Sequence, residues 1–128
     1  MKILLDTHVF LWWIIDSPKL SARAEAVIRD ESNTLFFSAA CGWEIAIKTQ
    51  LGRLHIPQTP ERFIPEQLAR NGMESLPISI THALHVAKLP ALHRDPFDRM
   101  LVSQAQIERL PILTIDPLIR QYRVETVW

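Results

Sequence analysis

Four acidic residues in this sequence lie within or directly after apolar segments: Asp6, Glu44, Asp98 and Asp116. Carboxylates held close together repel one another and raise one another's pKa, and a bound divalent cation removes that penalty. Carboxylate oxygens suit Mg²⁺ or Mn²⁺, and Mg²⁺ keeps water ligands and recruits substrate phosphates. If the fold gathers these acids, it supports metal-assisted phosphodiester hydrolysis, in which one or two ions generate hydroxide and stabilise the leaving oxygen.

Three of these acids also have a simpler interpretation as helix caps. Asp6 and Asp116 each precede a helix-like segment and are suited to cap it. Asp98 follows Asp95 by three residues, as in a capping box at a helix start. We give the capping role to Asp95, because Asp98 shares a helix face with the apolar Leu101 and therefore points inward.

Glu44 has two interpretations that its spacing does not separate. It lies in the run Trp43-Glu44-Ile45-Ala46-Ile47, and most of its helical neighbours are small or apolar. A half-buried Glu44 needs a cation or hydrogen bonds. The alternative is an ordinary surface pair with Lys48, worth only tenths of a kcal/mol.

The segments that position these acids alternate between strand and helix. Ile3–Leu5 is a short apolar run typical of a strand buried on both faces, and Asp6 stands at its end. Further strands are predicted at 34–38, 74–79, 111–115 and 124–127. Helices are predicted at 8–15, 21–30, 39–51, 59 or 61 to 71, 81–89, 96–110 and 118–122. This order predicts an α/β fold with a largely parallel sheet between helices, and ligands bind at the carboxyl ends of such strands.

Length and composition predict a single intracellular domain spanning residues 1–128. The only cysteine is Cys41, so no internal disulfide forms, which suits a reducing cytoplasm. The apolar run at 9–15 is too short to span a bilayer, and we expect no membrane association. With 14 basic and 14 acidic residues the net charge is zero, so nucleic acid must bind to a local patch.

Other chemistries have weaker support. The chain has three glycines and contains neither a Walker A nor a dinucleotide-binding motif. Cys41 lacks partners for a zinc site, and no histidines show zincin spacing. His82 and His85 lie three residues apart, and we interpret them as hydrogen-bonded or solvated rather than as metal ligands.

The order and spacing of several short motifs resemble one family along almost the whole chain. These motifs are Leu4-Leu5-Asp6-Thr7-His8, Ser38-Ala39-Ala40, Trp43-Glu44-Ile45-Ala46-Ile47-Lys48, Leu51-Gly52-Arg53-Leu54, Arg94-Asp95-Pro96-Phe97-Asp98-Arg99-Met100-Leu101 and Leu113-Thr114-Ile115-Asp116-Pro117. Together they resemble the PIN-domain ribonucleases, and among these the VapC-type toxins of type II toxin–antitoxin pairs.

The resemblance implies a three-layer α/β/α sandwich around a mostly parallel sheet of about five strands. It maps the family's metal-binding and catalytic acids onto Asp6, Glu44, Asp98 and Asp116. Asp95 is an additional acid that supports the ligands or replaces Asp116 in metal binding. Thr7 and Thr114 resemble the hydroxyls that bind the carboxylates or waters. The implied cofactor is Mg²⁺ or Mn²⁺, as one or two ions.

The resemblance also implies partners. Such proteins usually form homodimers and are inhibited by a cognate antitoxin, whose C-terminal segment often inserts a basic residue into the active-site groove. RNA contact requires cations near the acids. The candidates are Arg94, Arg99, Lys48 and Arg53, followed by His93. Trp43 is suited to stack on bases, although core or dimer packing is the commoner role of such a residue.

These observations predict a cytoplasmic, metal-dependent endoribonuclease toxin. The alternative is a non-catalytic PIN-like module that binds protein or RNA, in which the acids cap helices and anchor a basic peptide. A DNA nuclease of the same superfold is a third possibility, but the chain has little room for additional DNA-clamping elements.

Overall fold

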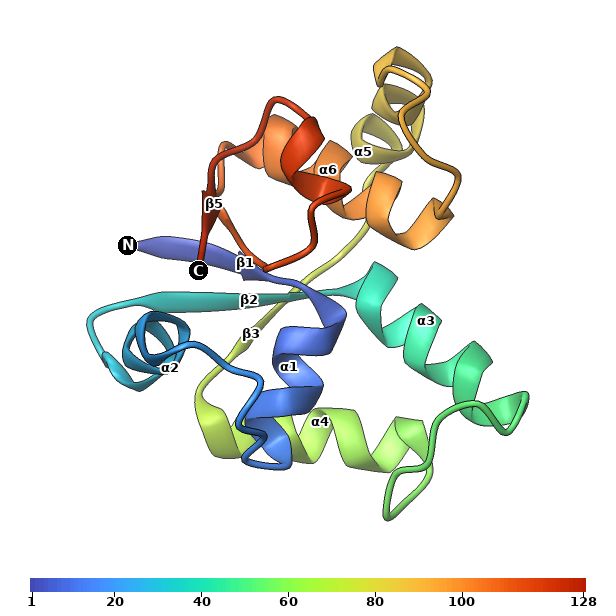
Figure 1. Ribbon diagram of the computed structural model, residues 1–128. Helices are drawn as coiled ribbons and strands as arrows, with labels where there is room; N and C mark the ends of the chain where they lie inside the picture. Colours follow the sequence, from blue (N-terminus) through green and yellow to red (C-terminus); the bar gives the residue numbers. More distant parts are fainter.

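Five parallel strands form one sheet in the computed structural model, which describes residues 1–128 (Figure 1). The strands are β1 (Lys2–Leu5), β2 (Thr34–Ser38), β3 (Glu74–Leu76), β4 (Ile112–Leu113) and β5 (Thr126–Val127). Their order across the sheet is β3-β2-β1-β4-β5, and all four pairings are parallel. The central strand β1 therefore pairs with segments that are distant along the chain, with Leu4 opposite both Phe36 and Ile112.

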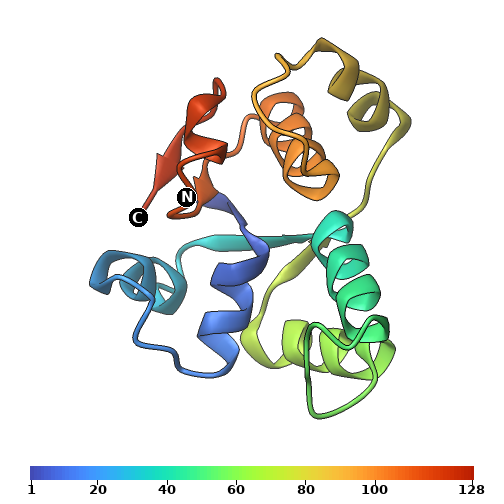
Figure 2. The same ribbon diagram turned by 45° about the vertical axis from the view of Figure 1, so that its right-hand side comes forward.

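Helices cover both faces of this sheet, which confirms the predicted α/β sandwich. They are α1 (Thr7–Ile14), α2 (Ala22–Arg29), α3 (Ala39–Gln50), α4 (Pro60–Asn71), α5 (Ile80–His85) and α6 (Pro96–Glu108), with 3₁₀ turns η1 (Val86–Lys88) and η2 (Ile119–Gln121). Figures 1 and 2 show α1, α2 and α4 on one side and α5 and α6 on the other. Helix α3 leaves the carboxyl end of β2 and packs against both α4 and α6.

The core is built around the buried strand that the apolar run at the start of the sequence predicts. Ile3, Leu4 and Leu5 are completely buried, as are Ile112 and Leu113 on the neighbouring strand. Burial of apolar surface is the main favourable term in folding. The buried pair β1 and β4 therefore holds the residues at its carboxyl end in fixed positions.

Several predicted segments are shorter in the structure. The strand expected at 74–79 ends at Leu76, directly before Pro77, and the strand expected at 111–115 covers only Ile112–Leu113. The helix expected at 81–89 begins at Ile80 and gives way to the 3₁₀ turn η1 after His85. No helix in the structure is both long and apolar enough to cross a membrane.

Candidate active site

The carboxyl ends of the two central strands carry the first pair of site residues. Asp6 follows β1 and Thr114 follows β4, and the Asp6 amide donates to the Leu113 carbonyl at 3.1 Å. The Thr114 hydroxyl donates to Asp6 Oδ2 at 2.7 Å. Although Asp6 stands at the N-cap position of α1, its side chain makes no capping hydrogen bond. The simple capping interpretation of Asp6 is therefore wrong.

Glu44 is buried one turn into α3, with 3% of its surface exposed. The Thr7 hydroxyl donates to Glu44 Oε1 at 2.7 Å, and the Lys48 ammonium donates to Oε2. The sequence left burial and pairing with Lys48 as alternatives, and the structure combines them. This arrangement satisfies the general requirement that a buried charge be paired and hydrogen-bonded.

Asp95 and Asp98 have different roles at the start of α6. Asp95 Oδ1 accepts the backbone amides of Phe97 and Asp98 at 2.9 and 3.1 Å, which makes Asp95 the N-cap. The side chain of Asp98 is only 15% exposed, and its Oδ2 lies 3.2 Å from Nε2 of His93. The aspartate that caps the helix thus fixes the backbone from which Asp98 projects.

Asp116 does cap the following turn, as its position before Pro117 suggested. Its Oδ1 accepts the Leu118 amide at 2.9 Å, and its own amide donates to the Thr114 hydroxyl at 3.0 Å. Thr114 therefore connects Asp116 to Asp6, and the charge of Asp116 acts on both Asp6 and Asp98.

Electrostatic repulsion links the acids into one site. Burial is the largest cause that raises the pKa of Asp98 to about 8, followed by the charges of Asp95, Asp6, Asp116 and Glu44 in that order. Burial also raises the pKa of Asp6, against the lowering effect of the Thr114 hydrogen bond. Four or more carboxylates that oppose one another's ionisation are a site where a divalent cation binds favourably.

The donor chemistry of this site fits Mg²⁺ or Mn²⁺, which prefer carboxylate oxygens. Oδ1 of Asp6 and Oδ1 of Asp98 accept no hydrogen bond, and neither is sealed from solvent, because no fully buried side-chain polar atom lacks a partner. No three acidic, His or Cys side chains are already arranged as a closed metal-binding group. We therefore expect the carboxylates to reorient when a cation binds.

The four predicted RNA-binding cations differ in their surroundings. Lys48 is committed to Glu44, and this hydrogen bond is the main factor that raises its pKa. The Arg99 guanidinium donates to the Pro90 carbonyl at 2.9 Å, to the Tyr122 hydroxyl at 3.1 Å and to the Val86 carbonyl at 3.4 Å. Arg53 and Arg94 are exposed. RNA binding by these residues stays a prediction.

His93 and Tyr122 are site residues to which the sequence gave little weight. His93 Nδ1 lies 2.8 Å from the Tyr122 hydroxyl, while its Nε2 faces Asp98. The only sequence signal was that His93 lies next to the Arg94-Asp95-Pro96 motif. By contrast, His82 and His85 are hydrogen-bonded to Glu108 and Gln106, respectively, as the sequence-based interpretation expected.

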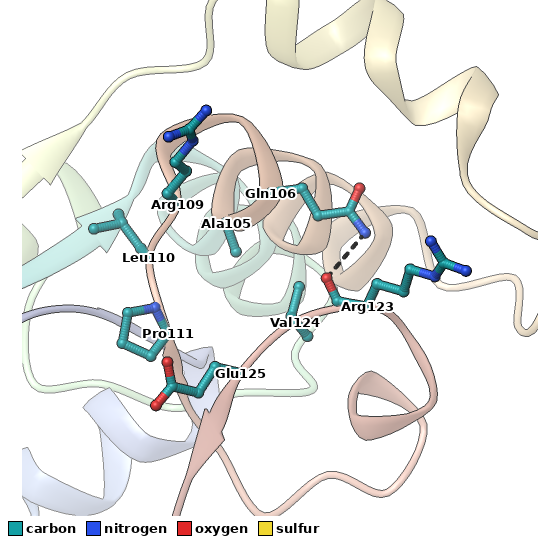
Figure 3. A pocket seen from close by; sticks show the side chains of 8 residues that line it. All are labelled: Ala105, Gln106, Arg109, Leu110, Pro111, Arg123, Val124 and Glu125. Carbon is teal, nitrogen blue, oxygen red and sulfur yellow. Dashed lines mark hydrogen bonds between the residues drawn. The ribbon is translucent and has the colours of Figure 1, made fainter.

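A pocket of about 260 Å³ lies away from the acids, where the chain enters β4 and β5 (Figure 3). Pro111 and Glu125 line it at the amino ends of those strands. Figure 3 shows the guanidinium groups of Arg109 and Arg123 pointing away from each other. The polar groups of this pocket therefore do not converge on a ligand, and the carboxyl edge remains the candidate site.

Comparison with known proteins finds one family that matches most of the chain. Residues 3–125 match the family described as "PIN domain". "Ribonuclease VapC16" from Mycobacterium tuberculosis is 35% identical over 72 residues, a match covering 53% of this chain and 51% of that protein. The chain thus spans about half the length of this curated relative.

Similarity to solved structures with the same fold extends over nearly the whole chain. VapBC2 from Rickettsia felis, bound to a promoter DNA fragment, gives a TM-score of 0.70 at 15% identity over 99% of this chain and 98% of that chain. FitAcB from Neisseria gonorrhoeae gives 0.62 at 18% identity over 100% and 97% of the respective chains. At such low identity these similarities establish the fold alone.

Proposed function

The chain belongs to the PIN-domain family, and from this membership we propose that it is a metal-dependent endoribonuclease acting as the toxin of a toxin–antitoxin pair. The observation that carries the proposal is the electrostatic coupling of Asp98 to Asp6, Glu44 and Asp116 at the carboxyl edge of the sheet. The similarity to a ribonuclease, VapC16, supports RNA as the substrate.

In this proposal the catalytic acids hold one or two Mg²⁺ or Mn²⁺ ions. Asp6, Glu44, Asp98 and Asp116 would be the ligands, and Asp95 would cap α6 and add negative charge or replace Asp116. A bound ion would supply a hydroxide nucleophile and stabilise the leaving oxygen. Thr114 and Thr7 orient Asp6 and Glu44 through the hydrogen bonds described above.

Binding of RNA is assigned to cations around this edge. Arg94 and Arg53 are exposed and suited to contact phosphates, which position a nucleic acid without reading its sequence. Lys48 and Arg99 complete the proposed set, although both side chains also bind groups of the protein itself. Substitution of Arg94 is expected to weaken RNA binding and to reduce its salt dependence.

We further propose that the protein is cytoplasmic, forms a homodimer and binds a cognate antitoxin. The structural neighbours VapBC2 and FitAB, each solved with DNA, support a protein partner of this kind. Apolar side chains such as Ile80 and Leu84 on α5 are exposed, and this supports a protein partner that buries them. Light scattering on the purified chain, alone and with its antitoxin, tests both assemblies.

The first experiment is RNA cleavage by nuclease-free protein with Mn²⁺, with Mg²⁺ or with EDTA. We expect cleavage only with the metals and loss of cleavage in Asp98→Asn. The matched control is Asp16→Asn, because Asp16 is exposed and has a φ of 53°, a conformation that Asn adopts readily. Equal cleavage by Asp98→Asn and the wild-type protein would contradict the proposal.

A non-catalytic binding module is the second candidate, because Asp95 and Asp116 do cap backbone amides. Acids that only cap helices give little specific response to Mn²⁺, whereas a metal site is stabilised by it. Parallel RNA and DNA substrates separate the ribonuclease from a DNA nuclease.

A further inference from the structure

Tyr122 connects two charged elements of the site through its buried hydroxyl. The residue is 4% exposed, and its oxygen lies 2.8 Å from His93 Nδ1 and 3.1 Å from Arg99 Nη1. On the other side of the imidazole ring, His93 Nε2 lies 3.2 Å from Asp98 Oδ2. The four side chains thus form a continuous hydrogen-bonded chain that ends on a proposed metal ligand.

When Asp98 is ionised, one set of directions gives every proton in these hydrogen bonds an acceptor. A guanidinium only donates, so the Tyr122 oxygen accepts from Arg99. The single hydroxyl proton of this buried Tyr122 then bonds to His93 Nδ1, because the hydroxyl has no other acceptor within hydrogen-bond distance. A neutral imidazole with Nδ1 as acceptor carries its proton on Nε2, and that N–H donates to Asp98.

Arg99, the first residue of this hydrogen-bonded series, is itself held in place by backbone groups. Arg99 donates to the carbonyls of Pro90 and Val86, which lie in the segment between α5 and α6. This segment leads directly to His93, so Arg99 fixes both the tyrosine and the backbone that carries the imidazole. The donor that reaches Asp98 is thereby aligned from two sides.

We propose that Arg99, Tyr122 and His93 form a positioning relay that selects the Nε2–H tautomer of His93 and so fixes the orientation of the Asp98 carboxylate. The His93 N–H is the one hydrogen-bond donor to the Asp98 side chain. By holding Oδ2, it leaves Oδ1 open towards a ligand. The predicted effect on turnover rests on the proposed ribonuclease function, whereas the tautomer is a property of the chain alone.

The tautomer is tested directly by NMR of ¹⁵N-histidine-labelled protein in EDTA at mildly alkaline pH. The His93 signals among those of the five histidines are identified by their absence in His93→Gln. We expect a protonated Nε2 and an unprotonated Nδ1 in the wild-type protein. Tyr122→Phe, which keeps the buried ring, should lose this fixed tautomer. A proton on Nδ1 in the wild-type protein, or an unchanged spectrum in Tyr122→Phe, overturns the relay.

Kinetics test whether this relay positions Asp98. We expect Tyr122→Phe and His93→Ala to lower kcat by about 10- to 100-fold with KM for RNA little changed. His93→Gln places an amide N–H near the position of Nε2 and should recover part of the loss. The control is His85→Gln, because His85 bonds to Gln106 on the far part of α6. A wild-type kcat in both Tyr122→Phe and His93→Ala refutes the positioning role.

Mn²⁺ binding separates failure of the relay from failure of the proposed function. If the wild-type protein cleaves no RNA, the Mn²⁺ concentration needed for thermal stabilisation still reports on Asp98. The relay predicts that this concentration rises by about 10- to 100-fold in Tyr122→Phe. Unchanged Mn²⁺ stabilisation in that variant contradicts the relay, whatever the catalytic result.

Discussion

Asp98 gives the folded protein a characteristic dependence on pH. Its pKa is raised from 3.8 to about 8, first by burial and then by Asp95 and the other acids. Between these values the unfolded chain binds fewer protons at this residue than the folded chain. The free energy of unfolding therefore falls as pH rises through this window.

We expect Asp98→Asn to remove most of this pH dependence and to raise the melting temperature of the metal-free protein at about pH 8, the folded-state pKa of Asp98. Thermal melts in EDTA at several pH values measure it. Asp16→Asn provides the control for the same chemical change on the surface. Parallel pH profiles for the wild-type protein and Asp98→Asn would refute this assignment.

Glu44 depends on Lys48 for charge compensation. Lys48→Met leaves the 3% exposed Glu44 carboxylate with the Thr7 hydroxyl alone. We expect the free energy of unfolding to drop by about 1–3 kcal/mol, because a buried charge loses its counter-ion. Addition of Glu44→Gln should restore part of the loss. Chemical denaturation of both single variants and the double variant measures the coupling, and additive losses would contradict it.

For single residues, the sequence identified the acids and hydroxyls of the site better than it identified their hydrogen-bond partners. Asp6 is marked by the strand that it follows, and the spacing of Glu44 and Lys48 is visible in the sequence. The bond between Thr114 and Asp6 joins residues 108 positions apart, and that between His93 and Tyr122 spans 29. Such pairs arise from strand order, which local patterns do not encode.

Helix α6 illustrates how one cap supports both an element and the site. Asp95 accepts two backbone amides, one of which belongs to Asp98. Asp95→Ala should lower the free energy of unfolding by about 1 kcal/mol, whereas Asp95→Ser should preserve most of the cap. Urea denaturation measures this difference.

RNA cleavage by the same two variants separates the cap from a metal ligand. If Asp95 acts through the cap alone, Asp95→Ser retains cleavage and Asp95→Ala loses part of it. Equal loss in both variants shows that the carboxylate itself is needed at the metal.

Element boundaries followed local chemistry where that chemistry was strong. Asp95 and Pro96 place the start of α6 where the sequence predicts it, and Gly72, with a φ of 63°, ends α4 as expected. The fourth strand was predicted too long because the hydrogen bond from the Asp116 amide to the Thr114 hydroxyl turns the chain after β4. Pro77 likewise follows the last residue of β3 directly.

For the whole molecule, alternation of strands and helices predicted the fold class but not the strand order. The order β3-β2-β1-β4-β5 places the beginning of the chain at the centre of the sheet. Nothing in the local sequence of β1 and β4 states that they are neighbours. The resemblance to a known family supplied the approximate number of strands and not their order.

A cation at the carboxyl edge should stabilise the entire fold, because the acids belong to several elements. At a Mn²⁺ concentration of 100 times Kd the gain is about 2.7 kcal/mol. We expect this gain in thermal melts of the wild-type protein, and its loss in Asp98→Asn. An equal gain in both would mean that Mn²⁺ binds elsewhere.

The placement of β1 between β2 and β4 also determines when the site can assemble during synthesis of the chain. Asp6 leaves the ribosome among the first residues, but Thr114, which directly follows β4, comes 108 positions later. A nascent chain that stops before β4 therefore holds three of the four site acids without the strand that brings Thr114 and Asp116 to them. Chains that terminate before β4 consequently lack the assembled carboxyl edge, and the complete site forms only after the last part of the sheet has been synthesised.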